Sequence, residues 1–176
     1  MKRINVIVML LITFLIVSVI PAVAQRGDDA NRASKNGKVE GTIEGVNITI
    51  EYGRPKVKGR TIWGGLVPFA KVWRTGADEA TTFAISKDVK VEGKTIAAGT
   101  YSLFSIPGEA EWTIIFNKVA KQWGAFRYDQ SQDVLRVNVK PAAAEHTEEM
   151  TFKIEGSKVV LYWEKLSIPF LIGAAE

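Results

Sequence analysis

One short segment of this sequence places several chemically capable side chains close together. Within residues 73–79 the chain carries an indole, a guanidinium and two adjacent carboxylates, from Trp73, Arg74, Asp78 and Glu79. An aromatic surface beside charged groups is able to hold a polar ligand, and the charges are equally able to pair with each other. A β-prone run follows at residues 81–86, so we expect this loop to lie at the end of a core strand.

Two further arginines occur in turns or loops beside apolar anchors. Arg54 follows Tyr52, and Arg60 precedes an apolar pair at residues 62–63. If the fold brings these loops to one end, they would form a cationic, aromatic-lined cleft for a carboxylate, a phosphate or a sugar. In the alternative, the guanidiniums form structural ion pairs with Asp78, Glu79 or Asp133, a role for which arginine is well suited. The candidate ligand-binding residues are Tyr52, Arg54, Arg60, Trp73, Arg74, Asp78, Glu79, Trp123 and Asp133.

Paired carboxylates are the strongest enzymatic possibility. Asp78 and Glu79 are adjacent, so on an extended backbone they point to opposite faces and cannot flank the same glycosidic bond. A second carboxylate would have to come from Asp129 or Asp133. Glycan hydrolysis by such a pair is therefore an alternative to the non-catalytic role that we favour.

The sequence has few residues that could bind a metal or a cofactor. The chain has one histidine and no cysteine, whereas zinc and transition-metal sites need several such ligands. His146 lies in a polar run, where we expect it to face solvent. No serine occupies a nucleophile elbow, and no glycine-rich run has the spacing of a phosphate loop. We expect no metal and no cofactor.

The five tryptophans divide into two groups. Trp112 and Trp163 fall on alternating apolar faces and are expected in the core. Trp63, Trp73 and Trp123 lie in loops with glycine neighbours, where they either cap the core or line a cleft. Capping is the default expectation, because burial removes a large apolar area from water.

Alternating apolar and polar residues predict about nine or ten short strands after residue 38. No segment beyond residue 24 has a convincing helical period. We therefore predict an all-β antiparallel sandwich, with a jelly-roll-like fold or a partly closed barrel as the alternative. Residues 141–144 are expected to form a connector, and residues 164–165 a turn between two strands.

The amino terminus predicts export. Lys2 and Arg3 precede an apolar run at residues 4–20, and small residues at 22–24 indicate cleavage between Ala24 and Gln25. An uncleaved membrane anchor is the alternative interpretation of this run. We predict a signal peptide at 1–24, a flexible tether at 25–38 and one domain at 39–176, with a periplasmic or secreted location and no stable membrane insertion after cleavage.

The charge balance argues against a nucleic-acid partner. The precursor has a formal net charge of +4, and removal of Lys2 and Arg3 with the leader lowers it by two. The remaining basic and acidic residues are interleaved along the chain, so no basic patch is evident.

A set of spaced motifs resembles the bacterial domain-of-unknown-function family 2911. The matching positions are residues 52–56, 58–64, 66–68, 73–81, 99–104 and 112–117, with further ones near Trp123, Tyr128 and Asp133. The resemblance covers roughly residues 46–172. It implies an exported, single-domain, β-rich bacterial protein, and it supplies no catalytic residue.

From these patterns we expect a non-catalytic binding or structural module of the bacterial cell envelope. Its ligand would be a small polar molecule or a carbohydrate, held in a loop cleft. A protein-interaction scaffold that uses an exposed sheet edge is the other alternative.

Overall fold

The computed structural model describes residues 26–175 of the chain. The predicted signal peptide, residues 1–24, lies outside the described residues. The described chain forms ten strands and one short 3₁₀ helix, η1, at Gln130–Gln132. The strands are β1 (Lys35–Ile43), β2 (Val46–Arg54), β3 (Thr81–Ile85), β4 (Val89–Val91), β5 (Lys94–Ile96), β6 (Gly99–Ile106), β7 (Trp112–Asn117), β8 (Asp133–Val139), β9 (Ala142–Glu155) and β10 (Lys158–Ala174).

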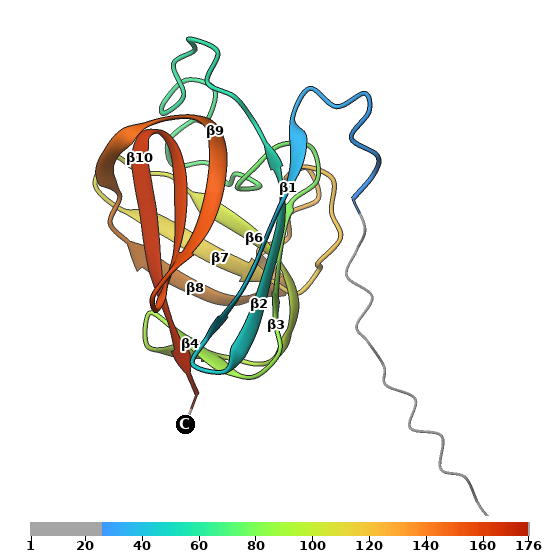
Figure 1. Ribbon diagram of the computed structural model, residues 1–176, viewed down its shortest axis with the longest axis vertical. Helices are drawn as coiled ribbons and strands as arrows, with labels where there is room; N and C mark the ends of the chain where they lie inside the picture. The colour runs from blue at the N-terminus through green and yellow to red at the C-terminus, as the bar shows by residue number, and fades with distance from the viewer. Residues whose placement is uncertain (1–25, 176) are drawn as a thin grey trace, which may run out of the picture.

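The strands form two antiparallel sheets that pack face to face. One sheet has the order β1-β2-β3-β6-β7-β8, and the other has the order β5-β4-β10-β9 (Figure 1). The sheets do not close into a barrel, which confirms the predicted all-β sandwich. Among the described residues, no helix is long and apolar enough to span a membrane.

Three buried indole rings, from Trp73, Trp112 and Trp163, lie in the core, and the partly buried Trp63 packs against them. Trp73 and Trp163 stack with ring centroids 5.8 Å apart, and Trp63 meets Trp112 and Trp163 edge-on at 5.0 and 5.5 Å. Because Trp63 and Trp73 come from loops, these contacts fix the loops to the sandwich. The capping role predicted for these two loop tryptophans is confirmed.

Three local expectations differ from the structure. Strand β1 begins at Lys35, inside the segment 25–38 that we expected to be a tether, because residues 35–38 pair with residues 51–54 of β2. The connector expected at 141–144 is wrong, since β9 begins at Ala142. The turn expected at Glu164 and Lys165 is also wrong, because β10 continues through it with register shifts and a positive φ of 56° at Glu164. A polar pair can occupy a bulge as well as a hairpin turn.

The N-terminal segment and the longest loop lie at one end of the molecule. The N-terminal segment 26–34 and the long loop that follows β2 lie at the end opposite the C-terminus (Figure 1). The 73–80 loop enters β3, and the 118–129 loop joins β7 to η1. Backbone hydrogen bonds hold these two loops against each other.

Candidate functional site

The 73–80 loop is fixed by backbone contacts on two sides. The Trp73 N–H donates to the Ser105 carbonyl at 2.8 Å, and the Ser105 N–H donates back to the Trp73 carbonyl at 2.9 Å. The Ala77 backbone passes so close to Gly53 that a Cβ there would lie 2.3 Å from the Ala77 oxygen. Glycine is therefore the residue type at this position of β2 that lets the loop approach this closely.

Two residues of this loop have strained backbones. Thr75 has φ of 50° and Asp78 has φ of 61°, both in the left-handed region that L-residues rarely adopt. The Thr75 hydroxyl donates to Ser105 Oγ at 2.9 Å, and the Thr81 hydroxyl donates to the Thr75 carbonyl at 2.7 Å. Such strain persists where surrounding contacts over-determine it, and it is often found at binding sites.

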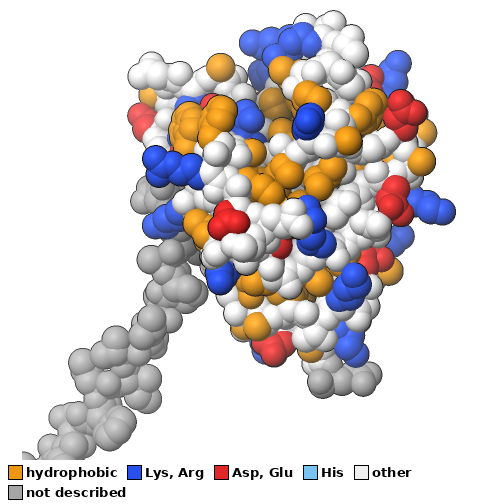
Figure 2. All heavy atoms as spheres, turned by 180° about the vertical axis from the view of Figure 1, so that it is seen from behind, with side chains coloured by type: hydrophobic (Ala, Val, Ile, Leu, Met, Phe, Trp, Pro, Cys, Tyr) orange, Lys and Arg blue, Asp and Glu red, His pale blue; other side chains and the backbone are white. Residues whose placement is uncertain are grey.

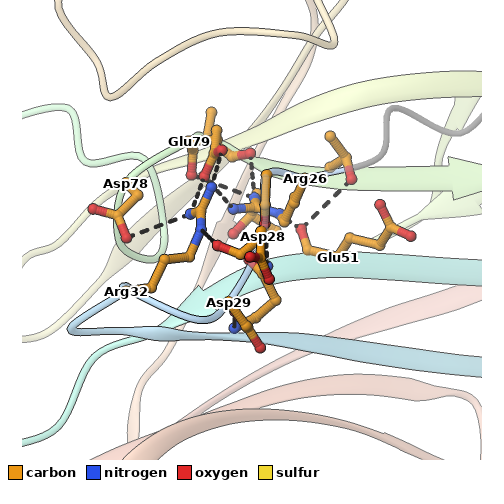
Figure 3. Close-up of polar contacts among 12 residues, drawn as sticks. Arg26, Asp28, Asp29, Arg32, Glu51, Asp78 and Glu79 are labelled. Carbon is orange, nitrogen blue, oxygen red and sulfur yellow. Dashed lines mark hydrogen bonds and ion pairs between the residues drawn. The ribbon is translucent and has the colours of Figure 1, made fainter.

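The Glu79 carboxylate accepts hydrogen bonds from two arginines of the N-terminal segment (Figure 3). Arg32 forms a bidentate pair with both carboxylate oxygens at 2.6 and 2.5 Å, and Arg26 reaches Glu79 Oε2 at 3.2 Å. Arg32 also lies 3.5 Å from Asp78 Oδ2. The hydrogen bonds from Arg32 are the main cause that lowers the pKa of Glu79 to about 2. Glu79 is thus a fixed carboxylate at neutral pH and is poorly suited to act as a general acid.

The 118–129 loop lies beside Glu79. Glu79 and Trp123 pair as an antiparallel β-bridge, and the Ala80 N–H donates to the Gln122 carbonyl at 2.9 Å. The Gly124 N–H donates to the Asp78 carbonyl at 2.9 Å. Trp123 is 61% exposed, in contrast to the three buried tryptophans. The default expectation that Trp123 caps the core is therefore wrong, because its backbone pairing leaves the ring outside.

Asp133 holds the base of the same loop. Its carboxylate accepts from Asn117 Nδ2 at 2.9 Å and from the Tyr128 hydroxyl at 2.6 Å, and Arg136 Nε lies 3.3 Å away. Burial, together with this hydrogen bond, raises the pKa of Tyr128 to about 12. Asp133 therefore orders the loop that carries Trp123.

A cleft of about 270 Å³ opens between the two loops. Its lining combines one exposed aromatic ring with acidic, basic, amide and hydroxyl groups. The lining residues are Arg26, Glu79, Ala80, Thr82, Ala120, Lys121, Gln122 and Trp123.

Two of the predicted site residues lie in the sandwich interior. Tyr52 is buried against Phe152, and its hydroxyl accepts a hydrogen bond from the Phe152 N–H at 3.1 Å. Trp73 is 8% exposed and donates from Nε1 to the Gly76 carbonyl at 3.1 Å. Trp73 thus fixes its loop from inside the core, whereas Tyr52 links β2 to β9.

The three arginines predicted to converge do not share one site. Arg54 pairs with Glu149 at 3.1 Å, and Arg60 hydrogen-bonds to carbonyls of its own loop. Arg74 is half-buried, burial lowers its pKa, and its Nε has no hydrogen-bond partner among the described residues. The structural ion pairs expected at Asp78 and Glu79 are present, but their partners are Arg26 and Arg32 instead.

Sequence reasoning missed Arg26 and Arg32 altogether. The pairs with Glu79 join positions 53 and 47 residues apart, so no local spacing indicates them. The polar composition of residues 26–34 pointed to a tether, because it offers no large apolar residue to pack. Thr82, Lys121 and Gln122 were also missed, although they flank the predicted residues Glu79 and Trp123.

Side-chain clusters for metal binding are absent from residues 26–175, where no group of three or more His, Asp and Glu residues converges. His146 is exposed, and its Nε2 lies 3.4 Å from Glu148 Oε2.

The fold and the cleft define a two-sheet antiparallel β-sandwich with a polar, aromatic-edged loop site at one end. The chain belongs to the family described as "Protein of unknown function (DUF2911)", whose model matches residues 34–172. No curated protein and no solved structure matches the chain.

Proposed function

We propose that this protein is a non-catalytic binding protein whose cleft between Glu79 and Trp123 holds a small polar ligand, with carbohydrate as the ligand class. The observation that carries the proposal is the 61% exposed ring of Trp123, fixed by backbone pairing at the edge of a cleft lined with hydrogen-bonding groups. An exposed indole beside polar groups offers an apolar face and a hydrogen-bonding edge to a ligand.

The groups in the cleft suit a sugar. One face of a sugar ring is apolar and packs on an indole, whereas its hydroxyls pair with carboxylates, amides and cations. Glu79 and Gln122 offer acceptors, and Lys121 offers a donor. The volume of about 270 Å³ is near the lower end of small-ligand sites, which span about 300–1,000 Å³, so it fits a single ring.

Order in the site favours binding without a large entropic cost. Trp123 lies on a loop anchored through Asp133, and Glu79 lies on a loop anchored through Ser105 and Gly53. Because these groups are already positioned, a ligand does not have to order them.

The test is a titration of the purified protein with monosaccharides, disaccharides and glycan fragments, and with organic acids for comparison. We expect at least one sugar to raise the melting temperature, and Trp123→Ala to abolish the shift. Phe126→Ala is the matched control, because Phe126 is a 90% exposed aromatic on the same loop that does not line the cleft. A shift that survives in Trp123→Ala, or the absence of any shift across the panel, would refute the carbohydrate site.

Export is the second part of the proposal. The charged n-region, the apolar run and the small residues before Gln25 support cleavage and release to the periplasm or beyond. Fractionation of cells that express the full chain, followed by mass spectrometry, should find a mature form that begins at Gln25 outside the cytoplasm. A chain that keeps residues 1–24 and stays in the membrane fraction would indicate an anchor.

A further inference from the structure

The guanidinium of Arg26 is enclosed by the body of the domain. Its side chain is only 6% exposed. Nη2 lies 2.6 Å from the carbonyl oxygen of Ala80, 3.1 Å from that of Glu51 and 3.3 Å from that of Glu79, while Nη1 donates to the Glu79 carboxylate (Figure 3). We call these three carbonyls and the Glu79 carboxylate the arginine socket.

The socket is built from the sandwich and not from the N-terminal segment. Glu51 belongs to β2, and Ala80 directly precedes β3. The Ala80 N–H is held by the Gln122 carbonyl, and Glu79 is bridged to Trp123. The three backbone carbonyls are therefore placed by the sandwich and its loops, whereas the Glu79 carboxylate is held by Arg26 and Arg32.

The socket engages the two terminal nitrogens of a guanidinium, while the buried Arg26 Nε has no hydrogen-bond partner among the described residues. Two nitrogens of one planar group serve four acceptors that lie in different directions, and one acceptor carries a full negative charge. A lysine ammonium has a single nitrogen and cannot reach the carbonyls and the carboxylate from one point with the same geometry. Arg32 adds a second guanidinium, which forms a bidentate pair with the Glu79 carboxylate.

The segment that supplies Arg26 is held by polar contacts alone. Residues 26–34 contain no apolar side chain larger than alanine, so no burial of large apolar surface fixes the segment. Its remaining contacts are polar and join either residues of the segment itself or the segment and the start of β1, such as the Asn36 N–H donating to Asp29 Oδ1 at 2.7 Å. Such a segment is exchangeable for another that presents the same guanidinium.

We propose that the arginine socket is a binding site for arginine-bearing peptide segments of a partner protein, with Arg26 as its resident occupant. Arg26 also lines the cleft beside Trp123, so its departure widens that cleft and places the exposed indole next to the incoming peptide. The site then recognises an arginine in the socket and a neighbouring side chain on Trp123. This ligand class is separate from the sugar proposed above.

The experiment uses the full mature chain with Arg26→Ala and Arg32→Ala combined, which empties the socket and retains its three carbonyls and the Glu79 carboxylate. The probes are N-acetyl-arginine amide and N-acetyl-lysine amide, and their binding is measured by calorimetry. We expect the arginine probe to bind the double variant about tenfold or more tighter than the lysine probe, as the loss of charge-assisted hydrogen bonds implies. The wild-type protein should bind it weakly, because its own Arg26 competes at a high effective concentration.

Adding Glu79→Gln to the double variant should remove the preference for arginine. Equal binding of the two probes, no binding at all, or a preference that survives Glu79→Gln would each overturn the proposal. If the double variant does not fold, Arg26→Lys keeps the charge and permits the same titration, in which the arginine probe should displace the substituted ammonium from the socket. Sugar binding is tested with Trp123→Ala and the arginine preference with Glu79→Gln, so the two proposals are tested by different variants and different probes.

Discussion

Trp123 and Glu79 are joined by a backbone bridge, so an exposed indole and a doubly paired carboxylate occupy neighbouring positions on two different loops. The loops come from sites far apart in the sequence, one before β3 and one after β7. Their pairing creates an apolar surface and a charged surface side by side. The proposed binding roles depend on this one relationship. On the face opposite to the view of Figure 1, Figure 2 shows hydrophobic side chains gathered in patches with lysine and arginine side chains among them.

Glu79→Gln should make stability less dependent on acid pH. The pKa of Glu79 falls from its ordinary value of 4.5 to about 2 in the folded protein, chiefly through hydrogen bonds from Arg32. Ionised Glu79 therefore stabilises the fold at neutral pH, and this contribution is lost as the pH falls through about 4.5 toward about 2. Allowing for solvent screening, we expect a contribution of about 1–2 kcal/mol.

The measurement is urea unfolding of both proteins at several pH values. The difference in free energy of unfolding between wild type and Glu79→Gln should be largest near neutral pH and should shrink in acid. Glu109→Gln is the control, because Glu109 is exposed. A difference that stays constant across the acid range would contradict the assigned pKa.

Much of the fold could be predicted because it is encoded locally. Alternation along Val46–Arg54 and Asp133–Val139 identifies strands directly, since buried and more exposed residues alternate along both strands. The β10 strand was divided in two because Glu164 and Lys165 interrupt its apolar pattern. A bulge breaks the alternation without ending the strand, and a single sequence does not separate these cases.

The candidate site was predicted only in part, because some of its residues are far from the others in the sequence. Asp78, Glu79 and Trp123 were selected from their own surroundings. Arg26 and Arg32 belong to the site through ion pairs across the fold, and such pairs leave no periodic signal. The predicted convergence of Arg54, Arg60 and Arg74 did not occur, because each has a separate environment.

Trp123→Ala and Trp163→Ala should differ strongly in their effect on the free energy of unfolding. Trp163 is 1% exposed and contacts two other indoles, so its truncation should cost about 3–5 kcal/mol of unfolding free energy. Trp123 is largely exposed, so its truncation should change stability by no more than about 0.5 kcal/mol. Urea unfolding followed by circular dichroism gives both values. A large loss in Trp123→Ala would mean that the ring packs in the fold, and this would contradict its role as an exposed ligand-binding surface.

Gly53→Ala should disturb the 73–80 loop. The new Cβ would lie 2.3 Å from the Ala77 oxygen, so either β2 or the loop must move. We expect a loss of about 1–3 kcal/mol, as for other overpacked sites, together with weaker ligand binding. Gly173→Ala is the control, because the nearest atom to its new Cβ would be Glu44 Oε2 at 3.7 Å. Equal stabilities of the two variants would show that the loop does not need this close approach.

Asp133→Asn should loosen the Trp123 loop and shift the titration of Tyr128. Burial is the largest cause of the Tyr128 pKa of about 12, and the Asp133 carboxylate raises it further through a hydrogen bond and its charge. Removing the charge should therefore lower the Tyr128 pKa part of the way toward its ordinary value of 10.0. NMR of ¹³C-labelled tyrosine, with Tyr162 as an internal reference, follows this change.

Acrylamide quenching should show greater access to Trp123 in the same variant, since Asp133 no longer secures the base of the loop. If the Tyr128 pKa falls while quenching is unchanged, Asp133 tunes the tyrosine without ordering the loop, and the cleft owes its shape to the backbone contacts between the two loops.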